Sequence, residues 1–313
     1  MAIVISPGRT ETLAQHREPE SRFLRELRRN VQAHAFLIGS VLCFALFTWY
    51  PMIREILESF QRLHLGVTSY SGLRNYRQIT ADPYFWQAWR NTFQFTGLAL
   101  LFGFALPFAV AVVINEFRHA QAYLRILVYL PVMLPPVAGI LLFRNYFMDP
   151  TNAGLFNQLL SATHLPTSHW WGAAPSAMPS LVIISTWTNM GGAVLIYLAA
   201  LQGIPGELYE AAEIDGAGLF KRIWHVTIPQ TRTILSLLLM LQVVATMQMF
   251  TESFVATGGG PESSTVTIVY LAYNYAFEFG NFNTAEALGV IMFIVLGVFS
   301  CIYVWLERRG NEA

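Results

Sequence analysis

Two apolar segments of this 313-residue chain are interrupted by polar side chains that carry no charge. The first segment contains Ser185, Thr186, Trp187, Thr188 and Asn189, and the second contains Gln242, Thr246 and Gln248, with Glu252 at its end. Amides and hydroxyls hydrogen-bond a polyhydroxylated solute while an aromatic face packs on its C–H surface, whereas an anionic solute would require arginine or lysine at the same depth. The pattern favours a neutral, sugar-like solute. The alternative is that these side chains only join one helix to another within a membrane.

Other chemistries lack the residues that they need. A P-loop requires glycine and lysine before serine or threonine, and the only lysine, Lys221, follows Phe220. The seven histidines contain no pair four residues apart, and Cys43 and Cys301 lie in apolar segments, so we expect no metal site. Zero net charge argues against a nucleic-acid partner. We therefore expect no catalytic residue, no metal and no cofactor bound by this chain.

The composition indicates a membrane protein. Hydrophobic residues make up 54% of the chain and charged residues 12%, well below the roughly one quarter that is charged in soluble domains. Charge-free stretches of about 18 or more residues, long enough to cross a bilayer, recur along the chain. We expect an all-α membrane protein with six transmembrane helices, at about 34–53, 92–115, 126–146, 180–203, 232–252 and 285–307. Residues 1–33 and 308–313 are expected to be tails outside the transmembrane domain of residues 34–307.

Basic residues indicate the orientation of these helices. With both termini in the cytoplasm, 13 of the 19 arginine and lysine residues lie on the cytoplasmic side. The first external loop departs from this rule, because it holds Arg54, Arg62, Arg74, Arg77 and Arg90. Aromatic residues alternate with Arg74, Arg77 and Arg90, which predicts an amphipathic segment on the bilayer surface or, alternatively, a docking surface for a soluble partner. The first helix is expected to be an uncleaved span, since no small-residue cleavage motif follows it.

Prolines shape the third and fourth helices. Pro131, Pro135 and Pro136 remove backbone donors inside the third span, which predicts a broken helix. Such a helix either lines a passage or is kinked for structural reasons alone. The fourth helix is expected to begin after Pro179. Beyond the fifth helix, a Gly-Gly-Gly-Pro turn precedes residues 263–277, which are short for a span and are expected to form an interfacial helix on the external side.

The loop of residues 204–230, between the fourth and fifth helices, is rich in helix signals. Pro205 suits a first turn, where its missing N–H costs nothing, and acidic residues follow near the positive end of the helix. Ala211 and Ala212 favour helix and leave a small, smooth surface. Gly216 then allows the left-handed residue that ends a helix. A second short apolar stretch completes an expected helix–turn–helix at the cytoplasmic membrane surface.

The stretch ELYEAAEIDGAGLFKRIWHVTIP in this loop resembles the EAA loop of binding-protein-dependent ABC importer permeases. The matching residues are Glu210, Ala211, Ala212, Asp215, Gly216, Ala217, Ile228 and Pro229. Ile223 stands where members often have phenylalanine. Other stretches in the same order, including YLPVMLPPVAGILLFRNYFMDPTNAGLFNQLL and TGGGPESSTVTIVYLAYNYAF, resemble the carbohydrate branch of that family, the maltose-permease-like subunits. The resemblance covers nearly the whole chain beyond the N-terminal tail.

The resemblance implies a type I ABC importer permease in the bacterial cytoplasmic (inner) membrane. It implies as partners a second homologous permease, two ATPase subunits that bind ATP and magnesium, an extracytoplasmic solute-binding protein, membrane lipid and a sugar substrate. It assigns ATPase coupling to Glu210, Ala211, Ala212, Asp215, Gly216 and Ala217. It places the sugar site in the helices before and after the EAA loop, and thus directs the substrate pathway to Ser185, Trp187, Asn189, Thr246, Gln248 and Glu252.

Several alternatives stay open at this point. Identity with the family's sugar-contacting positions is poor, so the substrate is not fixed as maltose. A permease for glycerol phosphate or another polyol is the alternative within the family, disfavoured by the lack of basic residues at depth. A self-sufficient secondary transporter is a further alternative, and a membrane-embedded enzyme would need ionisable residues inside its spans.

Overall fold

The computed structural model describes residues 30–31, 37–64, 67–117, 119–151 and 153–312, so nearly all of the expected N-terminal tail lies outside the described residues. The chain divides into two compact units, Met1–Arg54 and Glu55–Ala313. In the first unit the chain is helical from residue 37, with a π-helical turn, η1 (Ala45–Trp49), and none of its residues 37–54 is buried. A helix that is apolar all round suits a lipid environment or a helical partner.

A small module opens the second unit, after α2 (Tyr50–Glu58) has led into it. β1 (Gln61–His64) and β2 (Val67–Tyr70) form an antiparallel hairpin, and α3 (Arg74–Ala81) packs beside it. The buried Asn75 holds the module together by donating to the carbonyl of Ser59 at 2.7 Å and to that of Gln61 at 2.8 Å. The aromatic and arginine-rich stretch is therefore divided between α3 and the first turns of the next helix.

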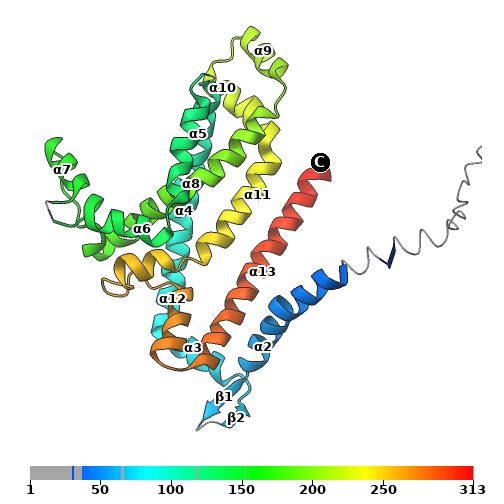
Figure 1. Cartoon of the computed structure of the whole chain (residues 1–313), viewed down its shortest axis with the longest axis vertical. Helices are drawn as coiled ribbons and strands as arrows, with labels where there is room; N and C mark the ends of the chain where they lie inside the picture. Colours follow the sequence, from blue (N-terminus) through cyan, green and yellow to red (C-terminus); the bar gives the residue numbers. More distant parts are fainter. Residues whose placement is uncertain (1–29, 32–36, 65–66, 118, 152, 313) are drawn as a thin grey trace, which may run out of the picture. The chain divides into compact units, whose positions relative to one another are not determined.

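Three long helices form the centre of the second unit: α4 (Pro83–Glu116), α8 (Ala174–Gln202) and α11 (Ile228–Met247). They pack against one another, α4 against both of the others (Figure 1). Asp82 caps α4 by accepting from the N–H of Tyr84 at 2.9 Å, and a proline in the first turn costs no hydrogen bond. α4 therefore begins well before the span expected at 92.

The fourth helix tolerates the prolines near its start. α8 begins at Ala174 rather than after Pro179. Pro175 lies in the first turn, where the missing N–H has no partner in any helix. Pro179 lies inside the helix and costs it one backbone hydrogen bond.

The third expected span is a broken helix, as its prolines predict. α5 (Gln121–Tyr129) and the 3-10 turn η2 (Leu130–Met133) are followed by α6 (Pro136–Leu142) and the π-helical turn η3 (Phe143–Phe147), and the two halves are bent by 97°. Both halves cross α8 closely. A side chain at Gly191 would lie 2.5 Å from the carbonyl of Val128, and one at Gly139 would lie 3.1 Å from Thr188 Cγ2.

The described chain has five unbroken helices that are long and apolar enough to cross a membrane, or up to six if the bent pair is one span. The connection after the bent pair holds α7 (Leu155–Ala162) and the turn η4 (Trp170–Gly172). Asn157 ties this connection together: its amide donates to the carbonyl of Ser168 at 3.0 Å and accepts from the indole of Trp170 at 3.0 Å.

The loop of residues 204–230 folds as α9 (Gly206–Ile214), α10 (Leu219–Arg222) and the π-helical turn η5 (Ile223–Thr227). Pro205 caps α9 rather than lying in its first turn. α10, η5 and α11 form one continuous helix from Leu219 to Met247. The fifth membrane helix thus extends into the loop, and it ends before the expected residue 252.

The last part of the chain contains η6 (Ser253–Thr257), α12 (Ile268–Tyr273), η7 (Asn274–Glu278) and the long helix α13 (Phe282–Glu312). The interfacial helix expected from residue 263 starts later, because residues 258–267 form a loop. Gly259 in that loop has a φ of +84°, and a side chain there would collide with Val266 and Tyr270 at 2.7 and 2.8 Å.

Polar side chains of α4 anchor this loop and the helix that follows it. Asn91 donates to the carbonyls of Ser263 and Val266, both at 2.9 Å, and Thr92 accepts from the N–H of Ile268 at 3.1 Å. The hydroxyl of Tyr275 in η7 donates to Asp82 at 2.5 Å. Burial, together with the Asp82 carboxylate, raises the pKa of Tyr275. α12 and η7 are therefore held at a fixed position against the start of α4.

Candidate functional site

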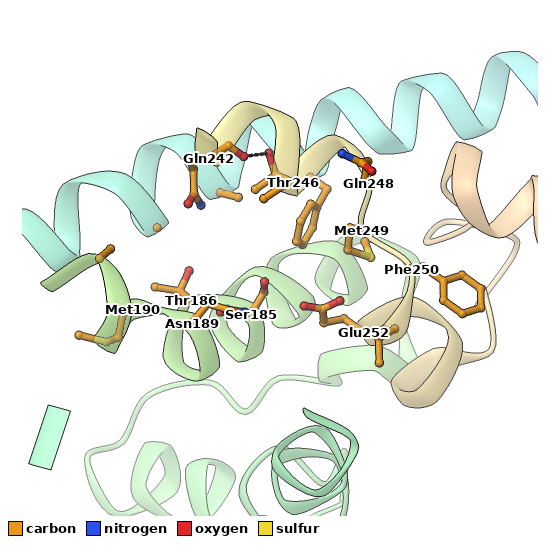
Figure 2. A pocket seen from close by; sticks show the side chains of 16 residues that line it. Ser185, Thr186, Asn189, Met190, Gln242, Thr246, Gln248, Met249, Phe250 and Glu252 are labelled. Atoms are coloured by element: carbon orange, nitrogen blue, oxygen red, sulfur yellow. Dashed lines mark hydrogen bonds between the residues drawn. The ribbon is translucent and has the colours of Figure 1, made fainter. Parts of the chain in front are cut away.

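α4, α8, α11 and the segment just beyond α11 line a cavity of about 290 Å³, called the polar cavity below. α4 contributes Gly103, where a side chain would lie 3.0 Å from Gln242 Nε2 and 3.3 Å from Thr186 Oγ1. The three helices thus approach one another where α4 has no side chain. Figure 2 shows the polar side chains of α8 facing those of α11 across this space.

Most of the residues expected in the substrate pathway line the polar cavity. They are Ser185 and Asn189 from α8, Thr246 from α11, and Gln248 and Glu252 from the segment just beyond α11. Thr186 and Gln242, which belong to the same two polar runs, also line it. Positions three and four apart share a face of a helix, which explains why residues 185, 186 and 189 point together.

Trp187 is not brought to this cavity. Its ring packs on Phe143 of η3, with centroids 5.0 Å apart, and it lines a separate apolar cavity of about 400 Å³ between α4 and α8. Thr188 also points elsewhere, toward Gly139 of α6. The polar residues of α8 thus lie on more than one face of the helix, and Trp187 packs against the broken helix.

The hydrogen bonds of the polar runs are all local. Thr246 donates to the carbonyl of Gln242 at 2.7 Å, Asn189 to that of Ser185 at 2.9 Å, and Gln248 to that of Val244 at 3.0 Å. Among the described residues, none of these side chains bonds a neighbouring helix. The structure therefore gives no support to the alternative that they serve to join helices.

Several polar groups in the cavity are left available. Within the described part of the chain, no hydrogen bond is made by the side-chain amide of Gln242, the hydroxyl of Thr186 or the carboxylate of Glu252. Polar groups in a water-poor site are costly unless a partner satisfies them. These groups are positioned to bond a solute or the water that it displaces.

The lining residues make the polar cavity nearly uncharged. Glu252 is the one charged residue among those that line it, and no arginine, lysine or histidine is in that set. Hydroxyls and amides can both donate and accept, which matches the hydroxyl groups of a neutral solute. An anionic solute would find no cation here and would meet the carboxylate of Glu252.

Sequence patterns missed the contribution of α4 and the apolar residues that line the cavity beside the predicted polar ones. Gly103 lies in an apolar run, where its one signal is an isolated glycine within a helix. Met190 and Phe250 also line the cavity and look like ordinary apolar residues in the sequence. The broken helix, expected either to line a passage or to be a structural kink, contributes no residue to this cavity.

The segment from α9 to η5, residues 206–227, is called the EAA hairpin below. Gly216 ends α9 with a φ of +73°, the left-handed region. The N–H of Ala217 donates to the carbonyl of Ala212 at 2.9 Å and that of Gly216 to the carbonyl of Glu213 at 3.0 Å, which are the two bonds of a Schellman motif. A side chain at Gly216 would meet no atom within 4 Å. Backbone conformation, not space, therefore requires glycine at this position.

The EAA hairpin exposes its large apolar side chains. The exposed fractions are 87% for Ile214, 86% for Phe220 and 70% for Trp224. Its polar side chains instead bond one another, as Tyr209 and Thr227 do through their hydroxyls at 3.1 Å. Exposed apolar groups among charged ones mark a surface for a protein or a membrane.

The expected coupling residues belong to this surface. Glu210, Ala211, Asp215 and Gly216 are exposed, and Ala212 and Ala217 are half-buried. Small residues on the outer face of α9 leave it smooth enough for another protein to approach its backbone. This arrangement, a short capped helix at the tip of a long membrane helix, is the second feature that a function must explain.

A family model described as the binding-protein-dependent transport system inner membrane component matches residues 102–311. The chain belongs to this family. The resemblance inferred from the EAA motif is thereby confirmed, and the chain is a permease with several membrane-spanning helices.

Two curated relatives match most of the permease. It is 30% identical over 308 residues to the arabinooligosaccharides transport system permease protein AraP of Halalkalibacterium halodurans, covering 96% of this chain and 97% of that one. It is 32% identical over 258 residues to the trehalose/maltose transport system permease protein MalF of Thermococcus litoralis, covering 80% and 85%.

The fold of the permease is also known from a solved structure. A chain of a bacterial ABC transporter involved in the import of the acidic polysaccharide alginate superposes with a TM-score of 0.79 and 24% identity, covering 92% of this chain and 99% of that one. The expected fold class, an all-α permease of the type I ABC importer kind, is confirmed.

Proposed function

We propose that the permease is one subunit of an ATP-driven importer for a neutral sugar or oligosaccharide in a bacterial inner membrane, with both termini in the cytoplasm. One observation carries the proposal: the polar cavity gathers hydroxyl and amide groups that, within the described part of the chain, hydrogen-bond no neighbouring helix. The relatives named for arabinooligosaccharide and trehalose/maltose transport support the same class of solute. The absence of a basic residue from the lining favours a neutral sugar over a phosphorylated polyol or an acidic one.

The polar cavity is half of a pathway in this proposal. Asn189 and Gln248 line it and remain exposed, so one side of the space is open in the single chain. A second, homologous permease would close that side. An extracytoplasmic solute-binding protein would deliver the sugar, as suggested by the solved alginate transporter in complex with its pentasaccharide-bound periplasmic protein.

The EAA hairpin would dock on one of two ATPase subunits. Its exposed apolar side chains and smooth α9 fit a cleft on a protein, and Glu210, Asp215 and Gly216 are the residues to which we assign coupling. ATP and magnesium would be held by those partner subunits. The continuous helix from Leu219 to Met247 would then carry a movement of the hairpin to Gln242 and Thr246.

The decisive experiment is transport by the assembled complex in lipid vesicles, with ATP inside and the solute-binding protein outside. We expect ATP-dependent uptake of neutral saccharides that a protonophore does not abolish. Gln242→Leu removes the free amide at similar size and should raise KM about three- to tenfold, the loss expected for one neutral hydrogen bond. Gln230→Leu is the matched control, because Gln230 is an exposed residue of the same helix.

Three outcomes would overturn the proposal. Uptake that persists with inactive ATPase subunits and collapses with a protonophore would make the chain a secondary transporter. Preference for phosphorylated or uronate solutes would remove the neutral sugar. Equal KM values for the Gln242 and Gln230 variants would remove the polar cavity from the pathway.

A further inference from the structure

A second hollow adjoins the polar cavity at the end of α11 that lies away from the EAA hairpin. It is a groove of about 390 Å³ between α12–η7 and the start of α13, called the aromatic groove below. Phe250 lines both the cavity and the groove, so the two spaces are neighbours. Figure 2 places Phe250 at the end of the row of side chains that begins with Gln242.

Aromatic rings follow the groove in regular steps. Phe250 and Tyr273 have ring centroids 5.2 Å apart, Tyr273 and Phe277 5.0 Å, and Phe277 and Phe282 5.9 Å. All four line the groove. These separations are those of contacting aromatic side chains, so the rings form a continuous strip that leads outward from the cavity.

The outer rings of this aromatic strip are exposed. Phe277 is 67% exposed and Phe282 is 54% exposed, whereas Tyr275, two residues before Phe277, is buried and bonds Asp82. Together with the loop that Asn91 anchors, Tyr275 fixes the helix so that the side of Tyr273 and Phe277 stays open. The fold thus fixes the rings of Tyr273 and Phe277 in position without burying them in the hydrophobic core.

Carboxylates complete the chemistry of the groove. Glu55 and Glu286 line it together with the rings. α13 leaves room for the Glu55 carboxylate at Gly289, where any side chain would collide with it. Asn283 donates to one oxygen of Glu286 at 3.4 Å, Glu286 also hydrogen-bonds the side chain of Glu58, and a carboxyl group has sites for several hydrogen bonds. A hydrocarbon chain or an apolar partner helix in this groove would strip water from both carboxylates and supply no donor.

We propose that the aromatic groove is an outer sugar-binding subsite, which holds the part of an oligosaccharide that extends beyond the polar cavity. The proposal rests on the proposed function. Ring faces pack on the C–H surface of a sugar while carboxylates accept its hydroxyls. Because Phe250 lines both spaces, the groove is the place where a saccharide longer than the polar cavity would continue.

The test compares saccharides of increasing length in the reconstituted complex. Tyr273→Ala and Phe277→Ala should each raise KM for tri- and tetrasaccharides about three- to tenfold, the loss of one aromatic contact, and change KM for a disaccharide less than about twofold. Phe279→Ala is the matched control, because Phe279 is an exposed ring just after η7 that does not line the groove. Tyr273→Phe and Phe277→Tyr keep the rings and should behave as the parent chain.

A second measurement distinguishes loss of the subsite from loss of folding. Phe277→Trp places a fluorescent ring in the groove, and its emission should change when a tetrasaccharide, but not a disaccharide, is delivered. A loss of uptake that is equal for all lengths, or a tryptophan that responds to neither sugar, would overturn the subsite and point to lipid or the second permease as the occupant. If the parent complex transports no neutral saccharide at all, the proposed function fails instead.

Discussion

The EAA hairpin and the polar cavity lie at the two ends of one helix and differ in which side chains they leave without a partner: apolar ones in the hairpin, polar ones in the cavity. In the hairpin, Tyr209 and Thr227 satisfy each other, while Phe220 and Trp224 face outward. In the cavity, polar side chains line the space beside apolar ones, and the amide of Gln242 is left without a partner among the described residues. The groups that a fold leaves unused indicate what it binds: a protein surface at the hairpin, and a hydroxylated solute at the cavity.

The helix that joins these regions explains how they could act together. Leu219–Met247 is continuous over 29 residues, about 43 Å at the usual rise per residue. Its one π-helical turn, η5, belongs to the hairpin itself, and the part from Ile228 to Met247 is regular α-helix. Packed helices move as rigid elements. A shift of the hairpin is therefore expected to move Gln242 and Thr246 as well, because the helix between the hairpin and the cavity does not bend to compensate.

The largest effect is expected from Gly216→Val. Valine at a φ of +73° is strained by about 1–3 kcal/mol, so the Schellman motif should open and α9 should lose its end. Uptake should fall at least tenfold, while the solute-binding protein still binds sugar. The measurement is ATP-driven uptake together with ATPase activity stimulated by the loaded binding protein.

Gly218→Ala is the matched control for this prediction. Gly218 has a φ of −67°, and a side chain there would meet no atom within 4 Å. Its uptake should stay within about twofold of the parent chain, since alanine adopts this backbone region freely. Equal loss in the two variants would show that the hairpin tolerates no change at all, and the role of the left-handed residue would be withdrawn.

A smaller effect, confined to substrate handling, is expected from Gly103→Ala. The added methyl would lie 3.0 Å from Gln242 Nε2 and 3.3 Å from Thr186 Oγ1, so it displaces the groups that meet the solute. KM should rise about three- to tenfold, with ATPase docking unchanged. Gly97→Ala, on the same helix and with open space around it, should match the parent chain. A rise in both variants would mean that α4 is sensitive to alanine in general.

The polar faces of α8 and α11 that line the polar cavity could be predicted from the sequence. Hydroxyls and amides inside apolar runs are visible without a structure, because a membrane helix has few reasons to hold them. The helix of the EAA hairpin and its end are equally visible, since alanine favours helix and Gly216 allows the left-handed residue that ends it. Both features were therefore predictable as local patterns, and the left-handed Gly216 confirms the predicted helix end.

Other parts depend on which helices pack together, and no local pattern contains that. Trp187 lies within the polar run, yet its ring faces Phe143 because the broken helix crosses α8 there. Gly103 has no polar signal and matters only because Gln242 lies opposite. α8 begins before Pro179 because Pro175 suits a first turn and the packed helix tolerates the hydrogen bond lost at Pro179. The exposure of Phe277 likewise follows from the anchoring of Tyr275.

The smallest effect is expected from Tyr209→Phe, which tests whether the polar groups of the hairpin are structural. The lost hydroxyl bonds Thr227 at 3.1 Å, so the free energy of unfolding should fall by about 0.5–1.5 kcal/mol while uptake stays within about twofold. Thr227→Val should cost a similar amount, and the double variant should cost less than the two together, because both remove the same bond. A strong loss of uptake in Tyr209→Phe with unchanged thermal stability would instead place this hydroxyl at the ATPase contact, and the contrast between the hairpin and the cavity would no longer hold.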